Sequence, residues 1–389
     1  MSKTYNFTIR ATDSSGAWAD RAFSATVSNT DWDRFIVCGG AYYWRSKTGL
    51  TWLKEIRAEA FHSVFFKNDR WFALTEVGGV RKISQSFDGI LWADCPINAL
   101  FPNIYWLYTV CYDSSISAWV FGFTTYDGVN PEEGRLVITN QAMTSYANLV
   151  APKPMRGASL GYEVYCRPGN ILVNDCQPTS SLARDTLFRL SHNFSPSLAG
   201  GVTNIAYPYN GPAYLSYMIP LDSAVLLRGG VAATANNGNF TSYIQHWMNI
   251  EGNTIGGRAP DTNYYGGKLS YSNGYLLTRN SIPLRQNDPP VTYTLPNAWI
   301  YSSDLGLSWS ASYSGSPQQL NNPPPFINPY VLIRSYGNVH VALGASYYGN
   351  VLVGIGTPVT SEVILPNSGV TAGMYAARNP WQSAVRYGE

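Results

Sequence analysis

Few residues of this chain occur at the spacings that catalytic or metal-binding motifs require. The four histidines lie far apart, without a neighbouring Cys, Asp or Glu at metal-site spacing: they are His62, His192, His246 and His340. Residues 127–133 (DGVNPEE) could offer oxygen ligands to Ca²⁺, but EF-hand spacing is missing and a solvated acidic loop is favoured. Serine-hydrolase, zinc-protease, Walker and dinucleotide-binding motifs are also missing. The sequence therefore predicts no catalytic residue, no metal site and no cofactor.

Composition excludes nucleic acid as a partner. The chain has 26 Lys and Arg against 24 Asp and Glu, a formal net charge of +2, and no basic cluster. Nucleic-acid binding needs Lys and Arg gathered on one face or groove. Charged residues make up only 13% and aromatic residues 14%. We therefore expect a surface rich in uncharged polar and aromatic side chains.

The cysteine spacing and the hydropathy pattern predict buried thiols and no membrane-spanning segment. Its five cysteines are odd in number and widely spaced, so we expect small buried hydrophobic side chains: Cys38, Cys95, Cys111, Cys166 and Cys176. The N-terminal residues lack the apolar core of a signal peptide, and no apolar run approaches the length of a membrane span. We expect a protein that is made in the cytoplasm and does not insert into a membrane.

Doubled aromatic residues are the candidate binding residues. Neighbours on a strand point to opposite faces, so one member of each pair cannot enter the same core. Exposed Tyr and Trp suit protein interfaces and sugar platforms. Packing between blades, with a chance surface aromatic, explains the pattern equally well. The residues are Tyr42, Tyr43, Trp44, Tyr264, Tyr265, Tyr347 and Tyr348.

The elements that must position these residues are strands. Short β-branched and aromatic runs bounded by turn residues recur, with no sustained helical pattern. One unit repeats: a strand, a tight polar turn and a second apolar strand. Its copies cover residues 66–74, 112–121, 166–173, 220–227, 271–277 and 336–341. Their spacing of about 50 residues is the period of a four-stranded propeller blade. The sequence predicts an all-β β-propeller.

A second repeated element is a turn. Residues 302–309 (SSDLGLSW) match the Asp-box pattern Ser-x-Asp-x-Gly-x-Ser/Thr-Trp. Residues 86–92 (SFDGILW) form a shorter copy, and residues 45–52 (RSKTGLTW) have Lys47 where Asp belongs. We expect Asp to accept backbone N–H bonds, Gly to supply positive φ and Trp to pack beneath the turn. The assigned residues are Ser302, Asp304, Gly306, Trp309, Ser86, Asp88, Gly89, Trp92, Gly49 and Trp52.

Because of these two repeated motifs, the chain resembles Asp-box propellers, which include sialidases and many non-enzymatic binding proteins. The resemblance covers residues 32–366 and implies seven blades, within a range of six to eight. A sialidase would need three Arg around a substrate carboxylate, together with Tyr, Glu and Asp. Arg34 lacks the Pro of the sialidase element, and Arg228 and Arg334 are single arginines on candidate inner strands. The sequence therefore favours a protein that is not an enzyme.

The two ends of the chain differ from the propeller repeat. Residues 1–31 contain two alternating strands around Asp13, and they resemble the end of an immunoglobulin-like or cadherin-like domain. Their apolar face needs a partner, and we expect the hairpin to be a docking segment. Residues 367–389 are predicted to form a C-terminal tail or a strap over the propeller.

An immunoglobulin-like ending beside an Asp-box propeller resembles structural proteins of tailed-bacteriophage virions. The resemblance implies a non-enzymatic tail fibre, host-attachment or decoration protein, made in the host cytoplasm and located in the virion. Its partners would be other virion proteins, further copies of itself and a glycan or protein of the host surface. A carbohydrate-binding or sialidase-like propeller is the alternative, and a cellular scaffold is the third hypothesis.

Overall fold

The fold consists almost entirely of antiparallel strands. The computed structural model describes residues 2–28, 33–38, 40–114, 116–126, 131–148, 163–167, 170–175, 186–190, 202–205, 213–220, 224–232, 240–249, 254–258, 270–279, 298–303, 310–314, 332–343, 351–365 and 375–377. Within these ranges the one helical element is a short 3-10 helix, η2 (Pro96–Ala99). The predicted all-β fold class is confirmed.

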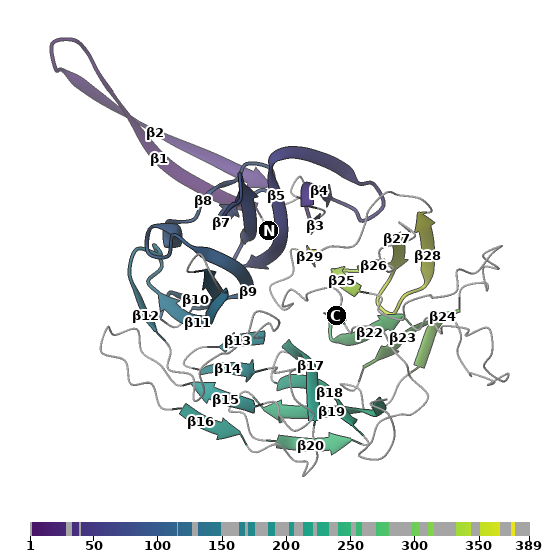
Figure 1. Cartoon of the computed structure of the whole chain (residues 1–389). Coiled ribbons are helices and arrows are strands. Elements are labelled where there is room, and N and C mark those ends of the chain that lie inside the picture. Colours follow the sequence, from purple (N-terminus) through teal and green to yellow (C-terminus); the bar gives the residue numbers. More distant parts are fainter. Residues whose placement is uncertain are drawn as a thin grey trace.

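The N-terminal hairpin is a sheet of its own. It pairs β1 (Ser2–Thr12) with β2 (Trp18–Ser28) over their full length, from Ser2 opposite Ser28 to Thr12 opposite Trp18. Asp13 closes the turn, because its Oδ1 accepts hydrogen bonds from the amides of Ser15 and Ala17 at 2.8 and 3.0 Å. Figure 1 shows this hairpin projecting away from the ring of the other sheets. The predicted hairpin is therefore present.

A seven-stranded sheet follows the hairpin. Its strand order is β29 (Tyr375–Ala377), β3 (Phe35–Cys38), β4 (Gly40–Ser46), β5 (Leu53–Lys67), β6 (Arg70–Val77), β7 (Val80–Ser86) and β8 (Ala93–Asp94). The first part of β5 pairs with β4 from Leu53, and its last part pairs with β6 as far as Lys67. One long strand thus belongs to two neighbouring four-stranded units.

Five four-stranded sheets complete the ring, each with its strands in sequence order. The first two contain β9 (Ile104–Asp113), β10 (Ala118–Tyr126), β11 (Pro131–Thr139), β12 (Tyr146–Asn148), β13 (Glu163–Arg167), β14 (Asn170–Asp175), β15 (Thr186–Leu190) and β16 (Val202–Ile205). The next contains β17 (Ala213–Pro220), β18 (Ala224–Ala232), β19 (Phe240–Asn249) and β20 (Thr254–Arg258). The last two contain β21 (Ser270–Ser272), β22 (Tyr275–Arg279), β23 (Ala298–Ser302), β24 (Ser310–Ser314), β25 (Leu332–Tyr336), β26 (Val339–Leu343), β27 (Val351–Ile355) and β28 (Ser361–Leu365).

The sheets surround a common centre, as Figure 1 shows, so the β-propeller prediction is confirmed. The C-terminal strand β29 pairs with β3 through Tyr375 opposite Val37. This pairing closes the sheet with strands that are far apart in the sequence. Strand β29 lies within residues 367–389, for which the sequence predicts a tail or strap. Counting β5 in two blades would give seven blades, and the blade number itself stays a prediction.

The core lies between the sheets. On β3, Ile36 and Cys38 face a cluster shared with β6 and β10, which includes Trp71 and Trp119. Phe35, the neighbour of Ile36, faces the opposite cluster instead, which contains residues of β26 and β27. Both faces of a blade are thus covered by its neighbours. Cys38, Cys95 and Cys111 are buried in this core and form no disulfide bond.

Candidate functional site

Two of the three predicted Asp boxes lie within the described residues and occupy equivalent connections. The 46–52 turn joins β4 to β5, and the 86–92 turn joins β7 to β8. The third box follows β23, where Ser302 is buried, and it leads into β24. Asp304, Gly306 and Trp309 of that box lie outside the described residues. All three boxes therefore connect the last two strands of a four-stranded unit.

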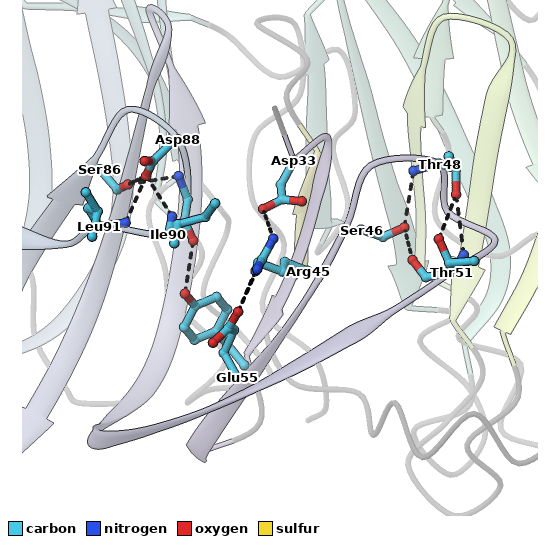
Figure 2. Close-up of polar contacts among 12 residues, drawn as sticks. Asp33, Arg45, Ser46, Thr48, Thr51, Glu55, Ser86, Asp88, Ile90 and Leu91 are labelled. Atoms are coloured by element: carbon cyan, nitrogen blue, oxygen red, sulfur yellow. Dashed lines mark hydrogen bonds and ion pairs between the residues drawn. The ribbon is translucent and has the colours of Figure 1, made fainter. Parts of the chain in front are cut away.

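The 86–92 turn is organised by one carboxylate and one hydroxyl group (Figure 2). Asp88 Oδ1 accepts hydrogen bonds from the amides of Ile90 and Leu91 at 2.8 and 2.9 Å. The Ser86 hydroxyl donates to the same oxygen at 2.9 Å and accepts from the Gly89 amide at 2.8 Å. Burial alone would raise the pKa of Asp88, but these hydrogen bonds outweigh it and hold the pKa below its usual value.

The 46–52 turn repeats this pattern with hydroxyl groups only (Figure 2). Thr48 Oγ1 accepts from the amides of Leu50 and Thr51 at 3.1 and 3.4 Å. Ser46 Oγ accepts from the Gly49 amide at 2.7 Å and donates to the Thr51 carbonyl at 2.6 Å. Thr48 thus takes the place of Asp88 and Ser46 that of Ser86, although Ser46 donates to the Thr51 carbonyl and Ser86 donates to Asp88.

This equivalence corrects the sequence alignment of the second turn. The alignment placed Lys47 at the position of the Asp, but the residue that accepts the two amides is Thr48. Lys47 is exposed and precedes it. The two described turns therefore have equal length, and the full match at 302–309 is the longer one.

The glycines of both turns lie against another blade. Gly89 has φ +81°, and a Cβ atom there would lie 2.8 Å from Ile36 Cδ1 of β3. Gly49 has φ +78°, and its Cβ would lie 2.6 Å from Val341 Cγ2 of β26. Only Gly combines this φ with so close an approach at low cost. Each turn therefore packs closely against the preceding blade.

The tryptophans complete the two turns differently. Trp52 Nε1 donates to the Gly49 carbonyl within its own turn at 2.7 Å. Trp92 Nε1 instead donates to the hydroxyl group of Tyr43 at 3.3 Å, and that hydroxyl donates to the Gly89 carbonyl at 3.0 Å. Burial raises the pKa of Tyr43 above its usual value. Tyr43 is therefore a structural link between β4 and the 86–92 turn.

The exposed-aromatic prediction is wrong for Tyr43 and Trp44. Tyr43 has no exposed surface, and Trp44 is 9% exposed. The two side chains do point to opposite faces, but each face of this blade packs on a different core cluster. Tyr42 is half-buried, with Lys54 Nζ 3.9 Å from its ring centre. Tyr264, Tyr265, Tyr347 and Tyr348 lie outside the described residues.

An ion-paired arginine stands beside the turns on β4 (Figure 2). Arg45 Nη1 lies 3.0 Å from Asp33 Oδ2, and Arg45 Nη2 lies 2.7 Å from Glu55 Oε1. Asp33 is almost fully buried, whereas Glu55 is partly exposed. Both carboxylates compensate the charge of one guanidinium group. The ion pairs therefore join β4 to β5 and to the segment before β3.

A polar cluster that the sequence did not reveal occupies the opposite end of β7. Glu76 Oε2 accepts from Arg81 Nε at 2.7 Å and lies 3.0 Å from His62 Nε2. The Arg81 guanidinium lies over Tyr105 and Trp106, at 4.4 and 4.6 Å from their ring centres. Burial, followed by the charge of Arg81, lowers the pKa of His62. The cluster ties β5, β6 and β7 to β9.

His340 and Arg334, for which the sequence predicts no catalytic or metal-binding role, have partners within the fold. His340 is buried between Ser335 Oγ and the Gly356 carbonyl, each at 2.8 Å, and burial lowers its pKa to about 4. Arg334 is buried and donates to the Ile333 carbonyl at 3.0 Å. The side chains of His192, His246 and Arg228 lie outside the described part of the chain. Among the described residues, no group of three His, Cys, Asp or Glu could hold a metal ion.

The hairpin carries exposed hydrophobic side chains on both of its strands. Phe7 and Ile9 of β1 are 46% and 52% exposed, and Phe23 of β2 is 37% exposed. Phe7 stacks on Phe23 with ring centres 5.6 Å apart. Every described side chain from residue 6 to residue 24 is classed as exposed. No helix in the described part of the chain is long and apolar enough to cross a membrane.

Comparisons with known proteins find similar solved structures but no related sequence. No family model and no curated protein matches the sequence. A post-proline cleaving enzyme from Rickettsia typhi matches with a TM-score of 0.50 at 8% identity, over 83% of this chain and 48% of that one. Prolyl oligopeptidase B from Galerina marginata matches at 0.48 and 8%, over 92% and 52%. The β-propeller domain of the Trilobed protease from Pyrococcus furiosus matches at 0.43 and 7%, over 90% and 89%. The chain thus spans about half the length of the first two enzymes.

The prediction of a phage virion component is wrong. The structural neighbours are mostly propellers of prolyl peptidases and of other enzymes, and nothing connects the chain with a virion. The location in a virion therefore has no support. At 8% identity the match to the Rickettsia typhi enzyme bears on the fold alone and says nothing about the activity of this chain.

Proposed function

We propose that this chain is a non-catalytic interaction protein, in which the propeller is a rigid platform and the hairpin of β1 and β2 docks on another protein. The observation that carries this proposal is the exposure of Phe7, Ile9 and Phe23 on a hairpin that forms a separate two-stranded sheet. Exposed apolar faces of this kind mark interaction sites.

The stability of the hairpin also argues for a partner. A two-stranded hairpin alone in water is marginal, because it buries too little apolar surface to offset the ordering of its backbone. Both strands have 11 residues, and each has one edge that pairs with no other described strand. Such edges are templates for pairing with another chain.

The polar groups of the propeller support a structural role for the repeated turns. The Asp88 carboxylate is occupied by its own turn, and Arg45 is held by Asp33 and Glu55. We assign the 46–52 and 86–92 turns as Asp boxes that pack against the preceding blade; residues 302–309 share their sequence pattern. These groups do not form a reacting site, which favours binding over catalysis.

Limited proteolysis tests the docking role. In the purified full chain, trypsin should cut first after the exposed Arg10 and Arg21 of the hairpin. In extract from the cells that make the protein, a bound partner should slow both cuts by about 10-fold or more. Cleavage after the exposed Lys47 of the 46–52 turn is the matched control, and its rate should not change.

Two results would contradict the docking role. Equal hairpin cleavage in the two preparations would mean that no partner covers the hairpin. Resistance of Arg10 and Arg21 in the purified chain would mean that the hairpin packs on its own propeller.

A further inference from the structure

The two faces of the hairpin differ in how their charges are compensated. The register places Phe7 opposite Phe23 and Ile9 opposite Arg21, so these four residues share one face, here the apolar face. Arg10 and Asp20 are paired on the other face. The apolar face therefore contains Arg21 as its one charge between residues 6 and 24.

The opposite face is compensated internally. Arg10 donates to both carboxylate oxygens of Asp20, at 2.7 and 2.8 Å, and its guanidinium lies 4.0 Å from the ring centre of Trp18. The turn carboxylate of Asp13 is likewise occupied by the Ser15 hydroxyl and by backbone amides. Neither carboxylate is available to Arg21.

Arg21 itself lies along the hydrophobic side chains. Its guanidinium carbon is 5.5 Å from the ring centre of Phe23. A cation inside a docking surface loses water when the surface is covered, and it then needs a carboxylate to compensate for that loss. Because the described hairpin offers none, the carboxylate has to come from the partner.

The size of the apolar face adds a second condition. Strands of 11 residues are roughly 37 Å long, and two strands are roughly 10 Å wide, so the face covers about 370 Å². A stable interface buries about 800 Å² on each partner. The remaining contact can come from the open edges of β1 and β2, which pair only with another strand.

We propose, on the basis of the docking function above, that the partner is a different protein whose β-sheet presents an apolar surface with an Asp or Glu facing Arg21. A second copy of this chain fits poorly, because its apolar face would bring Arg21 and no carboxylate. A lipid bilayer also fits poorly, since the hairpin tip contains the hydrogen-bonded Asp13 turn and the apolar side chains lie along its length.

Photo-crosslinking in the cells that make the protein tests this inference. The full chain carries benzoylphenylalanine in place of Ile9, alone or combined with Arg21→Glu or Arg21→Lys. Thr8→Glu is the matched control, because it adds a negative charge to the opposite face. Crosslinked peptides are identified by mass spectrometry.

We expect Arg21→Glu to lower the crosslinking yield by at least about 10-fold, and Arg21→Lys and Thr8→Glu to change it by less than about 3-fold. The crosslinked strand should carry an Asp or Glu within a few residues. Capture of a protein alone would not support the inference.

Three outcomes would overturn it. A protein crosslink that is insensitive to Arg21→Glu refutes the acidic partner and leaves the docking function standing. A crosslink to a second copy or to lipid refutes the heterologous β-sheet partner. The absence of any crosslink from all variants refutes the docking function together with the inference.

Discussion

The 86–92 turn and the 46–52 turn hold equivalent backbone amides with different acceptors. In one, Asp88 accepts two amides at 2.8 and 2.9 Å; in the other, Thr48 accepts the equivalent amides at 3.1 and 3.4 Å. Both turns contain a Gly with positive φ, and in both a Ser hydroxyl accepts a hydrogen bond from the amide of that Gly. The comparison shows that the glycine and the acceptor position are what the two turns share, so we expect the charge of the acceptor to matter less than either.

Removing the shared glycine should have the largest effect. Gly89→Ala forces a Cβ onto a residue with φ +81° and brings it to 2.8 Å from Ile36 Cδ1. The lost stability should be about 2 to 4 kcal/mol, from left-handed strain and overpacking together. Urea unfolding of the full chain measures it.

Gly79→Ala is the matched control for this loss. Gly79 has φ +83°, but nothing lies within 4 Å of its Cβ position. It should therefore show only the backbone strain, about 1 to 2 kcal/mol. Equal losses for the two variants would show that contact with the neighbouring blade adds nothing.

Removing the acceptors should separate the two turns. Asp88→Ala leaves two amides without their acceptor and should cost about 1 to 2 kcal/mol, whereas Thr48→Ala should cost about 0.5 to 1 kcal/mol. The same unfolding measurement compares them. A larger loss for Thr48→Ala would contradict the ranking that the distances give.

The sequence predicted the fold from signals that are local. The alternating strands within residues 1–31 and the repeated strand and turn units are visible because period-two patterns and turn residues act over a few positions. The pairing of β29 with β3 was not predictable, since it joins residues 375–377 to residues 35–37. Nor was the His62 cluster, whose members come from four strands that meet only in the fold.

The sequence also failed where one residue type replaced another. The Asp-box pattern requires a carboxylate, so Thr48 was overlooked and Lys47 was aligned instead. Exposure of Tyr43 and Trp44 was wrong for a different reason. Alternation shows that neighbours point to opposite faces, but it does not show that both faces of a blade are covered.

Lowering the pH should change the stability contributed by the 86–92 turn but not that contributed by the 46–52 turn. This difference should be smaller than the losses expected from removing the acceptors. Because the folded-state pKa of Asp88 is lowered, its contribution to stability is present above the unfolded pKa and is lost as pH falls through the folded pKa. Asp88→Asn should therefore lose less stability than the unmodified chain between about pH 5 and pH 2. Thr48→Ala is the control, and its stability difference should not change with pH. A parallel pH profile for Asp88→Asn would show that the carboxylate charge does not stabilise the turn.

The smallest effect should come from giving the 46–52 turn a carboxylate. Thr48→Asp places a charged acceptor where the hydroxyl group accepts the Leu50 and Thr51 amides, and we expect a gain of about 0.5 kcal/mol near neutral pH. The same residue introduced one position earlier, as Lys47→Asp, should give no gain, because that side chain precedes the acceptor position. Thermal unfolding of the two variants compares them directly. If Lys47→Asp stabilised the chain and Thr48→Asp did not, the sequence alignment would be correct and the equivalence of Thr48 with Asp88 would be wrong.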